Sequence, residues 1–190
     1  MPAGPVHRGL ARRPGGNPLP GRSGWSCRAQ SDWAALREPA IVLLRHANAP
    51  GVGDPPNFVA GDCTTQRNLD EQGREQARRI GEAFRQHGVD VRRVLSSQWC
   101  RTRETAALAF PGQAQDAPVF NSFFAEPGRR SPQTEQALQL LRAWKGPGVL
   151  VVVTHQVNIS ALTDGMTAPG EGVVLRRVQG RLQVVGRVSP

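Results

Sequence analysis

Apolar residues along the chain fall into short continuous runs that alternate with longer amphipathic segments. Residues 40–44 and 148–153 are such runs, bounded by proline or polar residues, which is typical of strands buried on both faces of a sheet. Elsewhere apolar residues recur at helical spacing, as in Ala77, Ile80 and Phe84. We predict strands at residues 40–44, 91–96, 148–153, 172–178 and 181–188 and helices at residues 69–87, 99–110 and 133–144.

The order of these elements predicts the fold class. Strands alternate with helices, which favours an α/β three-layer sandwich with a mainly parallel sheet flanked by helices. Only Gln179 and Gly180 separate the last two strands, which predicts a hairpin with a tight turn. Asp70 is expected to cap the first helix, and residues 49–63 and 111–131 are expected to be irregular.

The 190 residues carry a net charge of +9, which is unevenly distributed. Residues 1–30 contain five arginines and no acidic residue, so they account for +5 and leave +4 for the rest. Their many glycines and prolines predict a disordered basic tail, followed by one domain at residues 31–190. More than half of the net positive charge lies in this tail, and no DNA- or RNA-binding motif is present. We therefore expect no nucleic-acid partner.

Apolar segments are too short to suggest a membrane protein or an exported one. No segment approaches the roughly 20 consecutive apolar residues of a membrane span. A secretory signal needs about 7 to 15 uninterrupted apolar residues, and prolines and arginines break every candidate before Ser31. The sequence as written therefore predicts a cytoplasmic protein without a membrane span.

The three cysteines, Cys27, Cys63 and Cys100, lack the paired CxxC spacing of a zinc site, so no metal is expected. Cys63 and Cys100 either form a disulfide in an oxidising compartment or remain buried free thiols. Sequence separation does not decide between these states, because it does not set the distance between the two residues.

Polar residues with the chemistry of a phosphate site follow three predicted strands. Ligands bind at the carboxyl ends of strands in such sheets, so these residues are expected to meet in one crevice. Guanidinium groups match the oxygens of a phosphate bidentately, and a neutral histidine is a suitable nucleophile. The residues are Arg45, His46, Ser97, Arg101, Thr154 and His155.

Four ordered segments resemble motifs of the histidine phosphatase superfamily. Residues 44–47 (LRHA) resemble its Arg-His-Gly signature, and residues 69–77 (LDEQGREQA) resemble its helix-opening Leu-x-x-x-Gly-x-x-Gln-Ala pattern. Residues 96–106 (SSQWCRTRETA) resemble Ser-Ser-x-x-x-Arg-x-x-x-Thr-Ala, and residues 151–155 (VVVTH) resemble the strand that carries the second histidine. The resemblance spans about residues 40–161 and implies a phosphoglycerate mutase-like fold.

The resemblance also implies a metal-independent phosphatase with a covalent phosphohistidine intermediate. His46 would attack the phosphoryl group, while Arg45, Arg101 and His155 bind its oxygens. No cofactor is expected, because positioning and electrostatics dominate phosphoryl transfer. The expected partner is a phosphorylated small molecule or a phosphoprotein, with a phosphomonoester or a phosphohistidine; the oligomeric state is open.

Two other functions are weighed against the phosphatase. A phosphoglycerate-mutase-like phosphotransferase needs substrate-gripping insertions longer than the loops of this chain. A non-catalytic phosphate-binding module would keep the charged pocket without turnover. The presence of both histidines and both arginines argues against such a module.

The general acid that protonates the leaving group is open. Glu126 resembles the placement of this acid in one branch of the superfamily, and Asp62 and Asp54, in the loop after the first motif, are the alternatives. Asn48 and Gln156 neighbour the two histidines and are candidates for substrate binding or for backbone capping.

The chain departs from the superfamily pattern at two places. Ala47 stands where glycine is usual, which is tolerable only if this residue has a negative φ and the substrate leaves room for a methyl group. Gln98 and Trp99 replace the usual Pro-Leu of the third motif, which reshapes the pocket wall without removing charge.

Residues 62–69, Cys100 and residues 154–158 look similar to a small bacterial branch that includes phosphohistidine phosphatase and lipopolysaccharide core heptose phosphatase. Many of those relatives are exported. A periplasmic protein is therefore the alternative expectation, with residues 1–29 a mis-started reading in place of a signal peptide.

Overall fold

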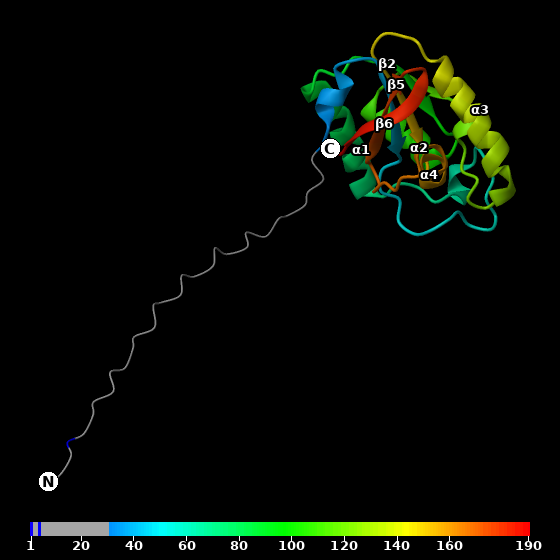
Figure 1. Cartoon of the computed structure of the whole chain (residues 1–190). Helices are drawn as coiled ribbons and strands as arrows, with labels where there is room; N and C mark the ends of the chain where they lie inside the picture. Colours follow the sequence, from blue (N-terminus) through cyan, green and yellow to red (C-terminus); the bar gives the residue numbers. More distant parts are fainter. Residues whose placement is uncertain (2–3, 5–30) are drawn as a thin grey trace.

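The computed structural model describes residues 31–190 together with residues 1 and 4, so the rest of the predicted tail lies outside the described residues. A single six-stranded sheet forms the centre of the fold (Figure 1). Its strands lie in the order β3-β2-β4-β1-β5-β6. Their bounds are β1 Ala40–Arg45, β2 Val91–Ser96, β3 Ala114–Asp116, β4 Val149–Thr154, β5 Gly172–Val178 and β6 Arg181–Val188.

The strand pairing places three strand ends at one edge. β1 and β4 pair in parallel along their whole length, from Ala40 opposite Val149 to Arg45 opposite Thr154. β2 pairs in parallel with the other side of β4, and β3 pairs in parallel with β2. β5 runs antiparallel to β1 and forms the predicted hairpin with β6. The prediction of a mainly parallel sheet is confirmed.

Helices cover both faces of the sheet, as expected for a three-layer sandwich. α1 (Glu71–Gln86) and α2 (Cys100–Ala109) lie on one face, and α3 (Arg130–Ala143) and α4 (Gln156–Thr163) lie on the other. In Figure 1, α1 and α3 are seen on opposite sides of the strands. No helix in the described part of the chain is long and apolar enough to cross a bilayer.

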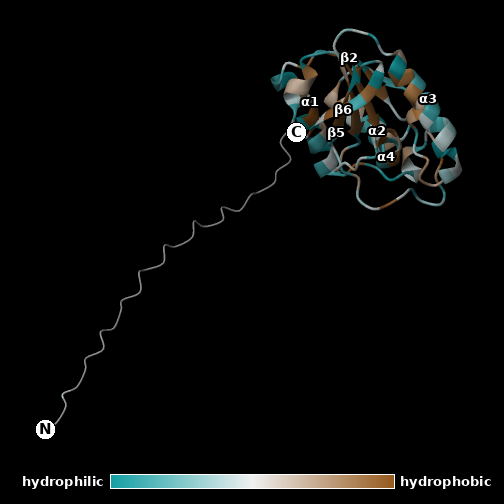
Figure 2. Cartoon of the chain, in the orientation of Figure 1, coloured by the Kyte–Doolittle hydropathy of each residue, from teal (hydrophilic) through white to brown (hydrophobic). Residues whose placement is uncertain are grey.

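Side chains of β1 alternate between two hydrophobic clusters, because successive residues of a strand point to opposite faces. Val42 packs in the cluster of Ile80 and Phe84 from α1, whereas Leu43 packs in the cluster of Ile159 from α4. All four central strand residues of β1 are buried, which explains its continuous apolar sequence. Figure 2 shows this concentration of hydrophobic residues in the central strands.

Most predicted elements are confirmed with small shifts at their ends. Asp70 caps α1 as predicted, since its side chain accepts a hydrogen bond from Gly73 N at 2.7 Å. α3 begins at Arg130, three residues earlier than predicted, because Pro132 is tolerated in the first turn of a helix.

Residues 111–131 are not wholly irregular, contrary to the prediction. They contain β3 and two short 3₁₀ helices, Pro118–Phe120 and Pro127–Arg129. The sequence of β3 has no apolar alternation because its three residues are exposed, and backbone pairing with β2 holds it in the sheet. The prediction also missed α4, whose eight residues are too few for a clear helical period.

Cys63 and Cys100 form a disulfide, which decides between the two states that the sequence left open. Their Cα atoms are 5.6 Å apart, within the range for such bonds. Cys63 begins a 3₁₀ helix, Cys63–Thr65, at the end of the Pro/Gly-rich loop, and Cys100 is the first residue of α2. The disulfide therefore fastens this loop to α2.

We predict that reduction of the Cys63–Cys100 disulfide lowers the free energy of unfolding by about 3–4 kcal/mol, because the bond closes a segment of 37 residues in the unfolded chain. Urea unfolding with and without reductant measures this change. The Cys63→Ser, Cys100→Ser double variant is the control and should not respond to reductant. A wild-type unfolding midpoint that reductant leaves unchanged would contradict the prediction.

Candidate active site

A cavity of about 240 Å³ opens at the edge of the sheet where β1 and β4 end. Four of the predicted site residues, which come from three remote segments, line it together: Arg45, His46, Arg101 and His155. The in-register pairing of β1 with β4 accounts for the meeting of the two histidines. His46 N donates a hydrogen bond to Thr154 O at 3.0 Å, so the two chains leave the sheet side by side.

His46 is held in the neutral tautomer that a nucleophile needs. Its ring is buried, and its Nδ1 lies 2.7 Å from Ala47 O. A carbonyl oxygen only accepts hydrogen bonds, so Nδ1 carries the proton and Nε2 keeps its lone pair. Burial, and then the positive charge of Arg101, lower the pKa of His46 to about 3. The ring is therefore unprotonated at neutral pH.

Residues of the second and third sequence motifs accept hydrogen bonds from the backbone that follows His46. Ala47 N donates to Thr105 Oγ1 at 3.0 Å, and Thr105 Oγ1 donates to Arg101 O at 2.7 Å. On the other side, Asn48 N donates to Gln76 Oε1 at 2.8 Å. The threonine and glutamine of the motifs thus hold the backbone that follows His46.

Close packing explains two small residues in the motifs. A Cβ on Gly73 would lie 2.0 Å from Asn48 O, so only glycine allows α1 to approach this backbone. Ala47 is fully buried and is not among the described residues with positive φ, which meets the first of the two conditions for replacing glycine there. That the substrate leaves room for its methyl group stays a prediction.

His155 is buried and connected to a network of polar side chains. Its Nε2 lies 2.8 Å from Ser97 Oγ, and Ser97 Oγ donates to Asn121 Oδ1 at 3.2 Å. The ring centroids of His155 and His46 are 5.5 Å apart. Burial, and then the charge of Arg101, lower the pKa of His155 well below its usual range. Without an anion in the cavity, both histidines are thus neutral.

Arg101 is almost completely buried and faces a carboxylate. Its guanidinium donates bidentately to Asp54, with Nη1 2.6 Å from Oδ1 and Nη2 3.1 Å from Oδ2. Asp54 also accepts from Trp99 Nε1 at 2.9 Å. Burial opposes ionisation of Asp54, but the hydrogen bonds and the charge of Arg101 outweigh it and lower its pKa. Asp54 thus accepts from guanidinium donors of Arg101 that also suit the oxygens of a phosphate.

Arg67 is a third cation of the cavity that the sequence analysis missed. Its Nε donates to Gly53 O at 2.8 Å, and its Nη1 donates to Ala49 O. The only signal in the sequence was its position two residues before the second motif. Arg45 Nη1 donates to Thr167 O at 2.6 Å, while its Nε is buried and has no partner among the described residues. Burial lowers the pKa of both arginines, which nevertheless stay protonated at neutral pH.

The three candidate acids differ in their exposure and in whether they line the cavity. Asp54 lines the cavity, whereas Asp62 is exposed and caps a 3₁₀ helix by accepting from Thr64 N at 3.0 Å. Glu126 is exposed, is not among the residues that line the cavity, and lies 3.6 Å from Arg129 in an ion pair.

Of the two polar neighbours of the histidines, only Gln156 lines the cavity. Its Oε1 accepts from Thr167 N at 2.9 Å. The Asn48 side chain instead donates to Asp70 Oδ2 at 3.2 Å, next to the start of α1, and is not among the lining residues. Within the described residues, no group of three or more His, Cys, Asp or Glu side chains is arranged to hold a metal ion.

A family model described as histidine phosphatase superfamily (branch 1) matches residues 41–120, which include the first three motifs. Over these 80 of its 190 residues, the chain is similar to the histidine phosphatase superfamily. The match includes Arg45, His46 and Arg101, and β4 adds His155 beyond its end. No curated protein matches the sequence.

Solved structures share the fold of this chain at low sequence identity. The open reading frame Rv3214 from Mycobacterium tuberculosis is 16% identical, with a TM-score of 0.62 over 79% of this chain and 97% of its own. Phosphoserine phosphatase from Entamoeba histolytica is 11% identical, with a TM-score of 0.60 over 80% and 98% of the two chains. The protein histidine phosphatase SixA, complexed with tungstate, is 18% identical, with a TM-score of 0.57 over 80% and 97%. At these identities the likeness shows the fold.

We predict that acid destabilises the folded domain through His46. Its folded pKa of about 3 lies below the roughly 6.5 of an unfolded histidine, so the unfolded state binds the extra proton between these values. This contribution to stability is present above pH 6.5 and falls by about 3 kcal/mol as the pH drops to 4. Urea unfolding at several pH values measures it.

The His46→Asn variant cannot titrate at this position and should lose that part of the pH dependence. His87→Asn, at an exposed histidine that ends α1, is the matched control and should follow the wild type. Parallel curves for wild type and His46→Asn between pH 4 and 6.5 would contradict the low pKa.

Proposed function

We propose that this protein is a phosphatase that hydrolyses a phosphomonoester or a phosphohistidine through a phosphohistidine intermediate on His46. One observation carries the proposal: the Nδ1 proton of His46 is bound to Ala47 O, which leaves a neutral Nε2 as nucleophile in a cavity lined by three arginines. The similarity of residues 41–120 to the histidine phosphatase superfamily supports phosphatase chemistry in general.

In the first step, the Nε2 lone pair attacks phosphorus and the bond from phosphorus to the leaving group breaks. Arg45, Arg67 and Arg101 bind the nonbridging oxygens and stabilise the charge that they carry in the transition state. A bound dianion also offsets the positive charge that lowers the pKa of His155, so this ring takes up a proton and binds an oxygen. These groups already line the cavity, and Arg101 and His155 are buried, which limits the cost of reorganisation.

In the second step, water attacks the phosphohistidine. The bond from phosphorus to Nε2 breaks, the water oxygen becomes part of inorganic phosphate, and its proton passes to the base that the leaving group's acid has become. His46 returns to the neutral tautomer held by Ala47 O. The cycle needs no oxidant, reductant or second substrate.

We assign the general acid to Asp54. It is the one carboxylate among the residues that line the cavity, whereas Glu126 would have to leave its exposed ion pair with Arg129. A phosphate that takes the Arg101 guanidinium frees Asp54 from the contact that lowers its pKa. The carboxyl group then regains a proton next to the leaving group, where it is needed.

The mouth of the cavity favours a leaving group with an apolar face. Val52 and Phe124 line the cavity and are 87% and 57% exposed, which is unusual for large apolar side chains beside a charged site. Beyond the three arginines, no cation lines the cavity that would bind a second acidic group of a phosphoglycerate. These features support an aryl ester or an apolar peptide segment over a mutase substrate.

The Cys63–Cys100 disulfide supports a location outside the reducing cytosol, because disulfides persist in oxidising compartments. We therefore favour the periplasmic alternative over the cytoplasmic one. Detection of the disulfide by alkylation and mass analysis of the protein taken directly from its cell tests this location.

We predict that His46→Ala lowers the kcat/KM for p-nitrophenyl phosphate by about a thousandfold or more, because it removes the nucleophile. A steady-state assay with His87→Ala as matched control measures the change. Equal rates for wild type and His46→Ala would refute the intermediate. Binding of phosphate without turnover by the wild type would favour the non-catalytic module.

We predict that Asp54→Asn separates substrates by their leaving groups. Alkyl phosphates need a proton on the leaving oxygen and should lose about a hundredfold in kcat, whereas p-nitrophenyl phosphate should lose less than about tenfold. Asp62→Asn and Glu126→Gln are the controls and should affect neither substrate. A loss for alkyl phosphates in Glu126→Gln instead would transfer the role of the acid to Glu126.

A further inference from the structure

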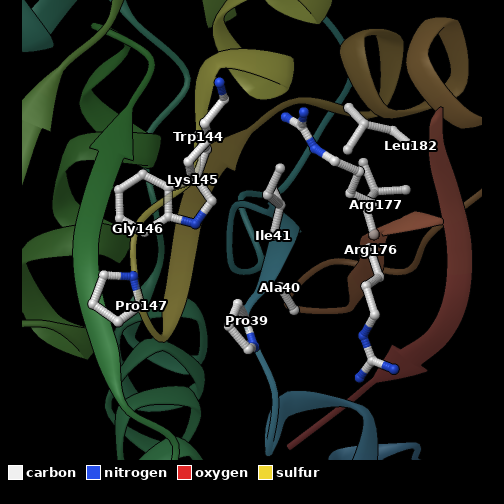
Figure 3. Close-up of a pocket in the computed structure, with 11 residues that line it drawn as sticks. Pro39, Ala40, Ile41, Trp144, Lys145, Gly146, Pro147, Arg176, Arg177 and Leu182 are labelled. Atoms are coloured by element: carbon white, nitrogen blue, oxygen red, sulfur yellow. The ribbon is translucent and has the colours of Figure 1, made fainter. Parts of the chain in front are cut away.

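A second cavity, of about 710 Å³, lies at the opposite end of β1 from His46. Ala40 and Ile41, which begin β1, lie in its wall, so it is roughly 16 Å along the strand from the nucleophile. The loop between α3 and β4, with Trp144 and Lys145, forms one side, and the β5–β6 hairpin forms the other (Figure 3). The two cavities share no lining residue.

The lining of this far cavity combines an apolar wall with unbalanced positive charge. Three cations line it, and no acidic residue does. Arg176 is compensated, since Nη1 lies 3.2 Å from Glu38 Oε2. Arg177 donates to the backbone oxygen of Arg142, and neither it nor Lys145 forms an ion pair within the described residues. Figure 3 shows the Lys145 and Arg177 side chains on facing sides of the cavity.

Trp144 adds a hydrogen-bond donor without an acceptor. Its Nε1 is buried and has no partner in the described structure, although buried donors are nearly always paired. Gly146 packs against the indole, because a Cβ there would lie 2.6 Å from the ring, so the tryptophan has little room to turn away. The cavity thus combines an unpaired donor with uncompensated positive charge.

We propose that this far cavity binds a small organic anion with a flat apolar body, such as an aromatic carboxylate or sulfonate. The anionic group would lie between Lys145 and Arg177 and accept from Trp144 Nε1, and the apolar body would cover Ile41, Leu175 and Leu182. A cation would meet only like charge, and a neutral apolar ligand would leave the donor unpaired. The lining contains no histidine, so the site binds its ligand without the phosphohistidine chemistry.

Fluorescence titration of the full chain with 8-anilinonaphthalene-1-sulfonate tests the site, since this dye has the proposed chemistry. We expect saturable binding whose Kd rises at least about tenfold in Lys145→Ala, Arg177→Ala. Arg92→Ala, Arg93→Ala removes the same charge from exposed positions of β2 and should leave the Kd unchanged. Trp144→Phe keeps an apolar ring but loses the donor, and should raise the Kd several-fold even if the double variant folds poorly.

Turnover of p-nitrophenyl phosphate by each variant checks that the fold is retained, because none of the substituted residues lines the catalytic cavity. Saturating tungstate, an analogue of phosphate, should not displace the dye. Displacement by tungstate would place the dye at the arginines around His46 and overturn the proposal. Absence of binding, or equal Kd values in both double variants, would overturn it as well.

Discussion

The parallel, in-register pairing of β1 with β4 is the constraint on which the candidate site depends. Arg45 lies opposite Thr154, so the residues that follow, His46 and His155, leave the sheet at the same level. Their ring centroids are 5.5 Å apart although 109 positions separate them in the numbering. A register shift by one residue would turn one histidine to the other face of the sheet, because side chains alternate along a strand.

The electrostatics of the cavity follow from burying cations beside neutral histidines. The charges of Arg101, Arg67 and Arg45 all lower the pKa values of His46 and His155, after burial itself. Asp54 is the one carboxylate of the lining and satisfies two donors of Arg101. The lining therefore has an excess of positive charge, which Asp54 offsets in part. A bound dianion would offset this charge as well.

The two central strands β1 and β4 were predictable because they are buried on both faces and read as continuous apolar runs. β3 was not, since backbone pairing alone places its three exposed residues in the sheet. Motifs at strand ends were sufficient to predict Arg45, His46, Arg101 and His155, because parallel strands end together. Arg67 and Asp54 reach the cavity from an irregular loop, whose path no periodicity in the sequence describes. The sequence analysis therefore missed Arg67 and left Asp54 as one of three candidate general acids.

The departure from the superfamily pattern at Trp99 coincides with contacts that hold the loop that carries Asp54. Trp99, in place of the usual leucine, donates through Nε1 to Asp54 and stacks on Phe58 with centroids 4.9 Å apart. The next residue, Cys100, joins the loop covalently through Cys63. Trp99 and Cys100 thus fasten the Asp54 loop at three points. The departure at Trp99 is therefore explained by the loop that carries Asp54.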